Sequence, residues 1–309
     1  MRTLIIDDLH DSFIEYLESK RLAYDYKPDC EPDWVNQNIH NYEILVLRSK
    51  LQVDKKFLAQ AKRLKFIARA GSGMDNIDEL AAQNAGIVLI HAGEANADAV
   101  AEHTLGLLIG LLRNIPKAYH EVQNKVWLRE ENRGVEFSDL VVGIIGFGNT
   151  GSAFARKLSG LGCETIFYDK FLSGLTTPFA KESLLEQLFE RADVLSFHIP
   201  LNEMNKGLIN LELINNCKKP VYLLNVSRGG IMNTEDMIKA LKQKKILGLG
   251  LDVLENEKPA TFSSAEDKMF NELVAMPNVV ITPHIAGWTG ASYRKISSVL
   301  ALKLNALLT

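Results

Sequence analysis

Short apolar runs alternate with amphipathic helical patterns through the first ninety residues of the chain. The runs that predict β-strands are residues 3–7, 43–49, 64–73 and 86–91. Helical patterns begin near Ser12 and near Asp54. Strands that alternate with helices are typical of an open parallel sheet, because parallel neighbours need a long crossover connection.

A second series of apolar runs begins at Val141. Its candidate strands are residues 141–145, 164–169, 193–200, 221–227, 246–253 and 278–284. These runs are rich in β-branched residues and show little alternation, which is typical of strands covered on both faces. The pattern predicts a second α/β sheet.

Three segments connect or close these series. Residues 97–120 predict one long, mostly apolar helix that leads from the first domain to the second, and residues 126–140 predict a loop. Residues 291–308 predict an amphipathic helix that returns to the first domain. We therefore expect one domain of residues 1–96 with 286–309, and a second of residues 97–285.

Composition narrows the class of protein. The 309 residues are 47% hydrophobic and 24% charged, and their formal net charge is -3 with basic residues scattered, so we expect no nucleic-acid or membrane partner. The longest apolar run, residues 104–112, is too short to span a bilayer. The N-terminal segment lacks the pattern of a secretory leader. Three cysteines without paired spacing favour a reducing, cytoplasmic location.

Polar or glycine-rich groups follow the predicted strands of the second series. They are residues 146–151, Asp169, and residues 198–200, 227–230, 252–257 and 283–287. Open α/β sheets bind ligands at the carboxyl ends of their strands. We therefore expect a binding site along this edge.

The run "GFGNTG" at residues 146–151 has the spacing of a dinucleotide-binding turn. Gly146 permits the tight turn, Gly148 lets the backbone approach a pyrophosphate, and Gly151 lets the following helix pack closely. Asp169 follows about 20 residues further on, where a ribose diol is bound. Its carboxylate favours NAD over NADP, although Lys170 weakens this inference. The alternatives are a glycine-rich turn without a ligand, and a turn or cap role for Asp169.

Three further residues are candidates for chemistry. Arg228 could bind a substrate carboxylate and carbonyl through two parallel hydrogen bonds, and its alternative is a surface salt bridge. Glu257 could raise the pKa of a nearby histidine, and its alternative is a solvated acidic loop. His284 could be a packed side chain, a metal ligand or a proton carrier. The cysteines are unpaired and the other histidines are not clustered, which argues against a metal and favours a general acid or base.

The ordered motifs "GIIGFGNTG", "YDK", "NVSRGGIMN", "LDVLENEKP" and "ITPHIAGWT" resemble those of the D-isomer-specific 2-hydroxyacid dehydrogenases. The earlier "LVLRSKLQV" and "ARAGSGMDNID" are most similar to the D-3-phosphoglycerate dehydrogenases of that family. The resemblance implies two doubly wound α/β domains, a Rossmann NAD-binding domain inserted into a flavodoxin-like substrate domain, with the active site in the cleft between them. It also implies a homodimer formed mainly through the nucleotide domain. We expect the chain to lack the C-terminal regulatory domain of longer phosphoglycerate dehydrogenases.

The resemblance also assigns roles to residues of this chain. Arg228 matches the substrate-binding arginine, Glu257 the partner of the catalytic histidine, and His284 the acid–base histidine. The implied cofactor contacts are Ser72, Gly146, Gly148, Asn149, Thr150, Gly151, Asp169, Ile199, Val226, Ser227, Arg228, Asp252, His284, Ala286 and Gly287. The implied substrate contacts are Arg48, Lys50, Ser72, Gly73, Asn96 and Arg228. Ordinary solvated charge is the alternative for Arg48 and Lys50.

Two features depart from the family pattern. Lys258 separates Glu257 from Pro259, whereas the proline usually follows the glutamate directly. Trp288 is bulkier than the residue expected there, and we expect it to wall the pocket. The resemblance implies oxidation of 3-phosphoglycerate in serine biosynthesis. The alternatives are a glyoxylate or hydroxypyruvate reductase, and an NAD-sensing protein similar to the corepressors that share this fold.

Overall fold

The computed structural model describes residues 1–308, which form two compact units. Unit 1 holds residues 1–97 and the segment that starts at Trp288, and unit 2 holds residues 98–287. The predicted boundaries, at 96/97 and 285/286, differ from these by one and two residues.

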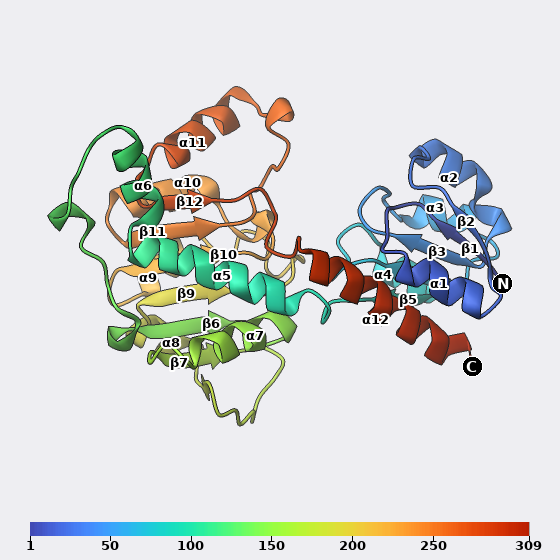
Figure 1. The fold of residues 1–309 in the computed structure, drawn as a ribbon, viewed down its shortest axis with the longest axis horizontal. Helices are drawn as coiled ribbons and strands as arrows, with labels where there is room; N and C mark the ends of the chain where they lie inside the picture. Colours follow the sequence, from blue (N-terminus) through green and yellow to red (C-terminus); the bar gives the residue numbers. More distant parts are fainter. Residues whose placement is uncertain (309) are drawn as a thin grey trace. The chain divides into compact units, whose positions relative to one another are not determined.

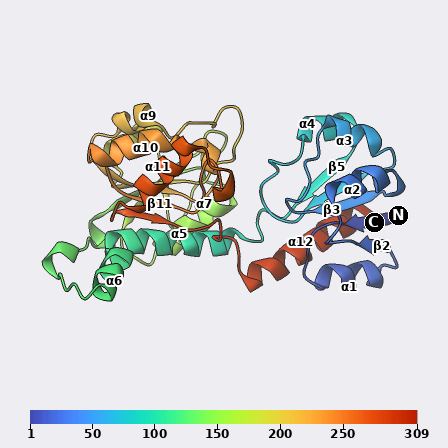
Figure 2. The same ribbon diagram turned by 90° about the horizontal axis from the view of Figure 1, so that it is seen from above.

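Unit 1 is built on a parallel sheet of five strands in the order β2-β1-β3-β4-β5 (Figure 1). The strands are β1 Arg2–Ile5, β2 Ala23–Tyr26, β3 Ile44–Leu47, β4 Phe66–Arg69 and β5 Val88–His91. The helices are α1 Ser12–Ser19, α2 Pro32–Asn38, α3 Lys55–Gln60, α4 Glu79–Asn84 and α12 Gly290–Leu308. Figure 2 shows α1 and α12 together on one face of this sheet, with α2, α3 and α4 on the other.

Unit 2 is built on a parallel sheet of seven strands in the order β12-β11-β10-β9-β6-β7-β8. The strands are β6 Val141–Ile145, β7 Glu164–Tyr168, β8 Lys181–Glu182, β9 Val194–Phe197, β10 Val221–Asn225, β11 Ile246–Leu251 and β12 Val279–Ile281. The helices are α5 Ala97–Leu112, α6 Ile115–Gln123, α7 Asn149–Leu158, α8 Leu185–Arg191, α9 Leu211–Asn216, α10 Thr234–Lys242 and α11 Ser264–Val274. The strand order reverses between β6 and β9, which makes that point a topological switch.

The predicted fold class is confirmed by the two parallel sheets, and two strands were missed. Strand β2 has the partly exposed sequence "AYDY" at the edge of its sheet, and β8 has two residues at the edge of the other. Central strands such as β3 and β9 are buried at every position. Edge strands carry less apolar signal because they bury less surface, so periodicity finds them poorly.

The prediction of one helix over residues 97–120 is wrong. Helix α5 ends at Leu112, Asn114 takes the left-handed conformation with φ 51°, and α6 starts at Ile115. Asparagine tolerates this conformation, and Pro116 is favourable in the first turn of a new helix. Within residues 1–308, none of the helices combines the length and the apolarity that a bilayer crossing needs.

Candidate active site

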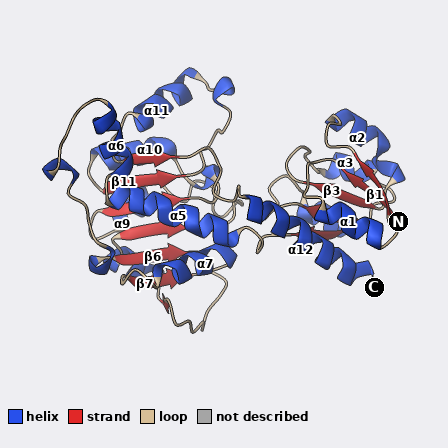
Figure 3. Ribbon diagram, viewed as in Figure 1, coloured by secondary structure: helices blue, strands red, loops and turns tan. Residues whose placement is uncertain are grey.

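The unusual residues of unit 2 gather along one edge of its sheet. Every pair of neighbouring strands in this sheet is parallel, so the carboxyl ends of the strands lie on the same side (Figure 3). The glycine turn follows β6, Asp169 follows β7, Arg228 follows β10, and His284 follows β12. Segments that are far apart in the sequence thereby share one edge.

The glycine turn after β6 leaves no room for side chains at two of its positions. Gly146 has φ 92°, and a Cβ atom there would lie 2.3 Å from the carbonyl oxygen of His198. A Cβ atom on Gly151 would lie 2.0 Å from the carbonyl oxygen of Gly146. Gly148 instead faces open space and directly precedes α7. A tight turn with open space at a helix N-terminus fits a pyrophosphate group.

The Asp169 carboxylate stabilises the turn that follows β7 and also contacts the glycine turn that follows β6. Its Oδ2 accepts the N–H of Phe147 at 2.7 Å, and its Oδ1 accepts the N–H groups of Phe171 and Leu172 at 2.9 and 3.1 Å. A carboxylate has about four acceptor positions, so these bonds leave capacity for a ribose diol. The ammonium group of Lys170 lies 3.6 Å from the sulfur of Met204.

The other predicted cofactor residues flank the same turn or the neighbouring strand ends. Asn149 and Thr150 open α7, and the Ile199 side chain lies against Gly146. Val226 is buried directly after β10. These placements are compatible with a dinucleotide along this edge. Within residues 1–308, no group of three or more His, Cys, Asp or Glu side chains is arranged to hold a metal ion.

His284 and Glu257 form a hydrogen-bonded pair. The Nδ1 atom of the imidazole lies 2.7 Å from Oε2 of the carboxylate, and the two side chains are 45% and 40% exposed. The hydrogen bond to Glu257 raises the pKa of His284, against the opposing effect of partial burial. The Arg228 charge lowers this pKa and the Asp252 charge raises it, which shows that both groups lie within electrostatic reach. A half-exposed imidazole with a raised pKa can take and return a proton.

The backbone of His284 is strained. Its φ of 55° lies in the left-handed region, which is uncommon for a residue with a side chain. The His284 N–H donates to the carbonyl oxygen of Asp252 at 2.8 Å. The buried Asp252 carboxylate accepts the N–H groups of Ile285 and Ala286 at 2.9 and 2.7 Å. Asp252, predicted only as a cofactor contact, therefore also holds the turn that carries His284.

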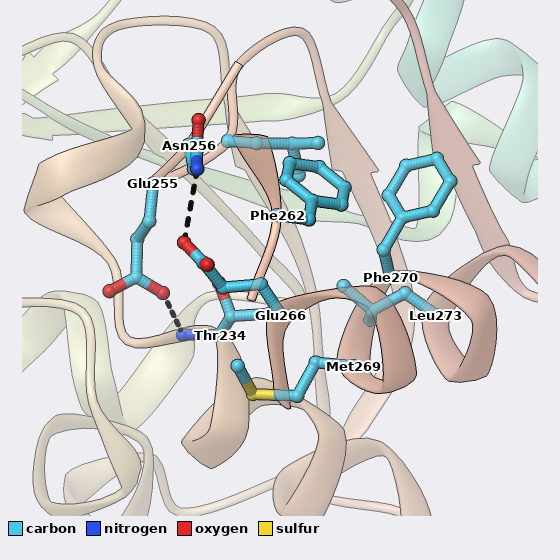
Figure 4. Close-up of a pocket in the computed structure, with 9 residues that line it drawn as sticks. Thr234, Glu255, Asn256, Phe262, Glu266, Met269, Phe270 and Leu273 are labelled. Carbon is cyan, nitrogen blue, oxygen red and sulfur yellow. Dashed lines mark hydrogen bonds between the residues drawn. The ribbon is translucent and has the colours of Figure 1, made fainter. Parts of the chain in front are cut away.

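The loop that carries Glu257 is anchored on both sides (Figure 4). Glu255 accepts the N–H of Thr234, at the start of α10, at 2.8 Å. The Asn256 side chain donates to Glu266, in the first turn of α11, at 3.1 Å and accepts the Lys258 N–H at 3.0 Å. Lys258, the inserted residue, is thus held in a local turn.

A small cavity lies behind this loop. Its volume is about 40 Å³, and it is lined in part by Phe262, Met269 and Phe270 (Figure 4). A volume of this size has room for a few water molecules, so the cavity is not a substrate pocket.

Arg228 sits in a turn organised by a buried amide. The side chain of Asn225 donates to the carbonyl oxygen of Arg228 and accepts the N–H of Ser227, both at 3.0 Å. The hydroxyl of Ser227 donates to the carbonyl oxygen of Phe197 at 2.7 Å, which ties this turn to β9. The residues "NVSR" therefore have a structural role in this turn, in addition to the contacts predicted for them.

Unit 1 carries its own group of predicted residues. The guanidinium carbon of Arg48 lies 4.7 Å from the ring centroid of Trp288 and 5.8 Å from that of Tyr293. The Nε atom of Arg48 donates to the carbonyl oxygen of Ala70 at 3.4 Å, and its backbone N–H donates to Asp7. The Trp288 ring thus makes a cation–π contact with Arg48, and its expected role as a wall of the pocket stays a prediction.

The remaining predicted substrate-binding residues of unit 1 differ in their contacts and positions. The Lys50 ammonium donates to the carbonyl oxygen of Pro28. Ser72 and Gly73 follow β4, and Asn96 follows β5, so they lie at the carboxyl edge of this sheet near the end of β3 that carries Arg48. The geometry thus favours Arg48 over Lys50 as an anion-binding group.

A Rossmann-type sheet with a pyrophosphate turn and an arginine near a histidine–carboxylate pair defines the class of nicotinamide-dependent dehydrogenases. Residues 105–286 match the family model described as "D-isomer specific 2-hydroxyacid dehydrogenase, NAD binding domain". The chain belongs to the D-isomer-specific 2-hydroxyacid dehydrogenase family and carries its NAD-binding domain. The resemblance inferred from the motifs and the choice of NAD are confirmed.

Three similar proteins illustrate the range of this family. Hydroxypyruvate reductase of Thermotoga maritima is 32% identical, across 98% of this chain and 97% of its own. D-3-phosphoglycerate dehydrogenase of Archaeoglobus fulgidus is 31% identical across 97% of this chain, which spans only 56% of that protein. The structure of D-lactate dehydrogenase from Aquifex aeolicus complexed with NAD and lactic acid is 25% identical, with a TM-score of 0.85 over 100% of this chain and 95% of the other.

Proposed function

We propose that the protein is an NAD-dependent dehydrogenase that interconverts a D-2-hydroxy acid and the corresponding 2-oxo acid. The observation that carries this proposal is the 2.7 Å pair of His284 and Glu257 on an NAD-binding domain. Arg228, after the neighbouring strand β10, supplies a guanidinium for the substrate carboxylate.

The proposed chemistry divides between these side chains. The glycine turn and Asp169 would hold NAD, which would supply the acceptor for the hydride on C2 of the hydroxy acid. His284 takes the hydroxyl proton as the C–O bond becomes a carbonyl, and Glu257 stabilises the resulting imidazolium. In reduction, protonated His284 returns the proton to the 2-oxo oxygen. Arg228 orients the carboxylate in both directions.

Arg48 makes a phosphorylated substrate our first choice. Within residues 1–308, its two terminal nitrogens make no hydrogen bond, while its guanidinium carbon lies 4.7 Å from the centroid of the Trp288 ring. A guanidinium held in this way is ready to bind a phosphate through two parallel hydrogen bonds. We propose 3-phosphoglycerate and 3-phosphohydroxypyruvate as the substrate pair, which would place the enzyme in serine biosynthesis. The relative from Archaeoglobus fulgidus supports this choice.

Hydroxypyruvate or glyoxylate reduction is the second candidate. Its support is the hydroxypyruvate reductase from Thermotoga maritima, which this chain matches over 97% of the relative's length. A phosphate-binding group is not needed for that substrate, so Arg48 discriminates between the two proposals. Lys50 contributes less, because it would have to leave the carbonyl oxygen of Pro28.

A substrate panel with NADH tests the function. We expect oxidation of NADH, followed by absorbance, with 3-phosphohydroxypyruvate ahead of hydroxypyruvate, glyoxylate and pyruvate. His284→Ala should lower turnover by about 10²–10⁴-fold and leave NADH affinity nearly unchanged. Near-normal turnover would contradict the role of His284, and silence of the wild-type protein with tight NADH binding would favour an NAD sensor.

The phosphate preference has its own variants. Arg48→Ala should raise KM for the phosphorylated substrate more than KM for hydroxypyruvate. Lys50→Ala should change the two KM values little, because the Lys50 ammonium is bound to Pro28. An unchanged preference in Arg48→Ala would move the proposal to hydroxypyruvate reduction.

We also propose a homodimer in the cytoplasm. The exposed side of α6 carries Ile115, Tyr119 and Val122 at helical spacing, and Trp127, which is 78% exposed, follows it. Apolar surface of this kind marks a protein–protein contact, and a second copy would cover it symmetrically. The three free thiols support a reducing compartment.

A further inference from the structure

His103, on helix α5, reaches the turn that carries His284. Its Nε2 atom lies 2.8 Å from the hydroxyl oxygen of Thr282 and 3.5 Å from Oδ1 of Asp252. The His103 side chain is 21% exposed, and the Asp252 side chain is 0% exposed. A residue 179 positions earlier in the chain thus contacts the segment just before the acid–base histidine.

The donors in this contact can be assigned from the chemistry of the groups. The Thr282 hydroxyl lies 2.6 Å from Oδ1 of Asp252 and donates to it, because an ionised carboxylate can only accept. The Thr282 oxygen is then left to accept, so His103 donates through an Nε2–H. The result is a chain of hydrogen bonds that runs from His103 through Thr282 to Asp252.

The last member of this chain holds the strained turn. The Asp252 carboxylate also accepts the N–H groups of Ile285 and Ala286, and its carbonyl oxygen accepts the N–H of His284. A left-handed residue persists only where its surroundings over-determine its conformation. The orientation of the Asp252 carboxylate therefore governs the direction in which the His284 imidazole points.

We propose that His103 is a positioning residue for His284. It orients the Thr282 hydroxyl, which orients the Asp252 carboxylate, which keeps His284 left-handed and its imidazole against Glu257. This inference rests on the proposed function for its catalytic consequence, whereas the hydrogen-bond chain itself can be tested without turnover. Buried networks of this kind are worth more than their separate bonds, because each group polarises the next.

Three variants test the chain. His103→Leu removes the donor, Thr282→Val removes the link, and His103→Gln keeps an N–H donor at a similar reach from the backbone. His40→Leu, at an exposed position of unit 1, is the matched control for the same chemical change. We expect His103→Leu to lower kcat by about tenfold, as loss of one buried hydrogen bond predicts, with KM for NADH within about twofold of wild type.

The rescue and the double variant separate positioning from general damage. His103→Gln should retain most of the wild-type kcat. The double variant His103→Leu/Thr282→Val should be no worse than either single variant, because both break the same chain. A kcat for His103→Leu equal to that of His40→Leu, or a His103→Gln variant as impaired as His103→Leu, would overturn the proposal.

Hydrogen exchange of the backbone amides provides a readout that needs no substrate. We expect faster exchange in residues 282–287 for His103→Leu and Thr282→Val, and wild-type rates there for His103→Gln, while β9 and β10 keep their protection. Unchanged exchange in residues 282–287 of His103→Leu would overturn the proposal. If the wild-type protein turns over no 2-oxo acid, the proposed function fails, yet this exchange pattern still decides the role of His103.

Discussion

Gly229 lies where the loops of Arg228 and Glu257 touch. It directly follows Arg228, and a Cβ atom at this position would lie 1.8 Å from the carbonyl oxygen of Leu254 and 1.9 Å from its carbonyl carbon. Leu254 is three residues before Glu257. Real Cβ atoms keep at least 3.0 Å from such neighbours, so Gly229→Ala must separate the two backbones by about 1.2 Å, the difference between 3.0 and 1.8 Å.

The size of this displacement sets the expected loss. Both clashing atoms belong to backbone, so no side chain can rotate away to relieve the contact. A misplacement of about 1 Å in a catalytic constellation costs roughly 100-fold in rate, and overpacking costs about 1–3 kcal/mol of stability. We therefore expect kcat/KM for 2-oxo acid reduction to fall by about two orders of magnitude in Gly229→Ala. The midpoint temperature of thermal unfolding should fall by roughly 2–4 °C for each kcal/mol by which the substitution lowers the free energy of unfolding.

The assay compares Gly229→Ala with Gly160→Ala. A Cβ atom on Gly160 meets nothing within 4 Å, so this control substitution causes no clash. Gly160→Ala should therefore keep the wild-type kcat/KM and the wild-type thermal midpoint. NADH absorbance gives kcat/KM, and calorimetry gives the midpoint. A Gly229→Ala enzyme within about threefold of Gly160→Ala in kcat/KM would refute the reasoning, since it would show that the two loops are not coupled through this contact.

Glu257→Gln replaces the carboxylate, which raises the pKa of His284, with a neutral amide. Oxidation of the hydroxy acid needs neutral His284, so the acid limb of its pH profile should move to lower pH. Reduction of the oxo acid needs protonated His284, so the basic limb of its pH profile should also move to lower pH. Limbs that stay at the wild-type pH would contradict this role of Glu257. Trp288→Ala should raise KM for the phosphorylated substrate about two- to fivefold through loss of a cation–π contact of roughly 0.5–1 kcal/mol to Arg48, whereas Trp288→Phe should keep part of it. Tyr119→Asp should shift the proposed dimer to monomer in sedimentation, and a dimer that persists in this variant would exclude α6 from the interface.

The features that could be predicted from the sequence are those that follow from the order and direction of the strands. Parallel strands place their carboxyl ends on one edge, so residue types at strand ends identify a site before any coordinate is known. Gly146, Asp169 and Arg228 could be found in this way because each occupies a motif position directly after an apolar run. The pairing of His284 with Glu257 was anticipated from their family motifs, and the structure supplies the 2.7 Å contact.

The residues that hold this site in place could not be predicted because they have no local signature. Thr282, Asn256 and Asn225 are ordinary polar residues in sequence, and their roles come from partners that only the fold brings near. The same holds for Lys50, whose bond to Pro28 spans 22 residues and changes its availability to a substrate. Periodicity also cannot register a single left-handed residue such as Asn114, which divided a predicted helix in two.

Trp288 has a contact in the structure that its size alone did not predict. From sequence, its bulk beside the acid–base motif suggested a wall for the pocket. In the structure, its ring lies 4.7 Å from the Arg48 guanidinium, whose terminal nitrogens make no hydrogen bond within residues 1–308. An aromatic face stabilises a guanidinium without using its N–H donors, whereas a carboxylate would occupy them. The contact with Trp288 therefore leaves the terminal nitrogens of Arg48 available to an anion, as the proposed phosphate preference requires.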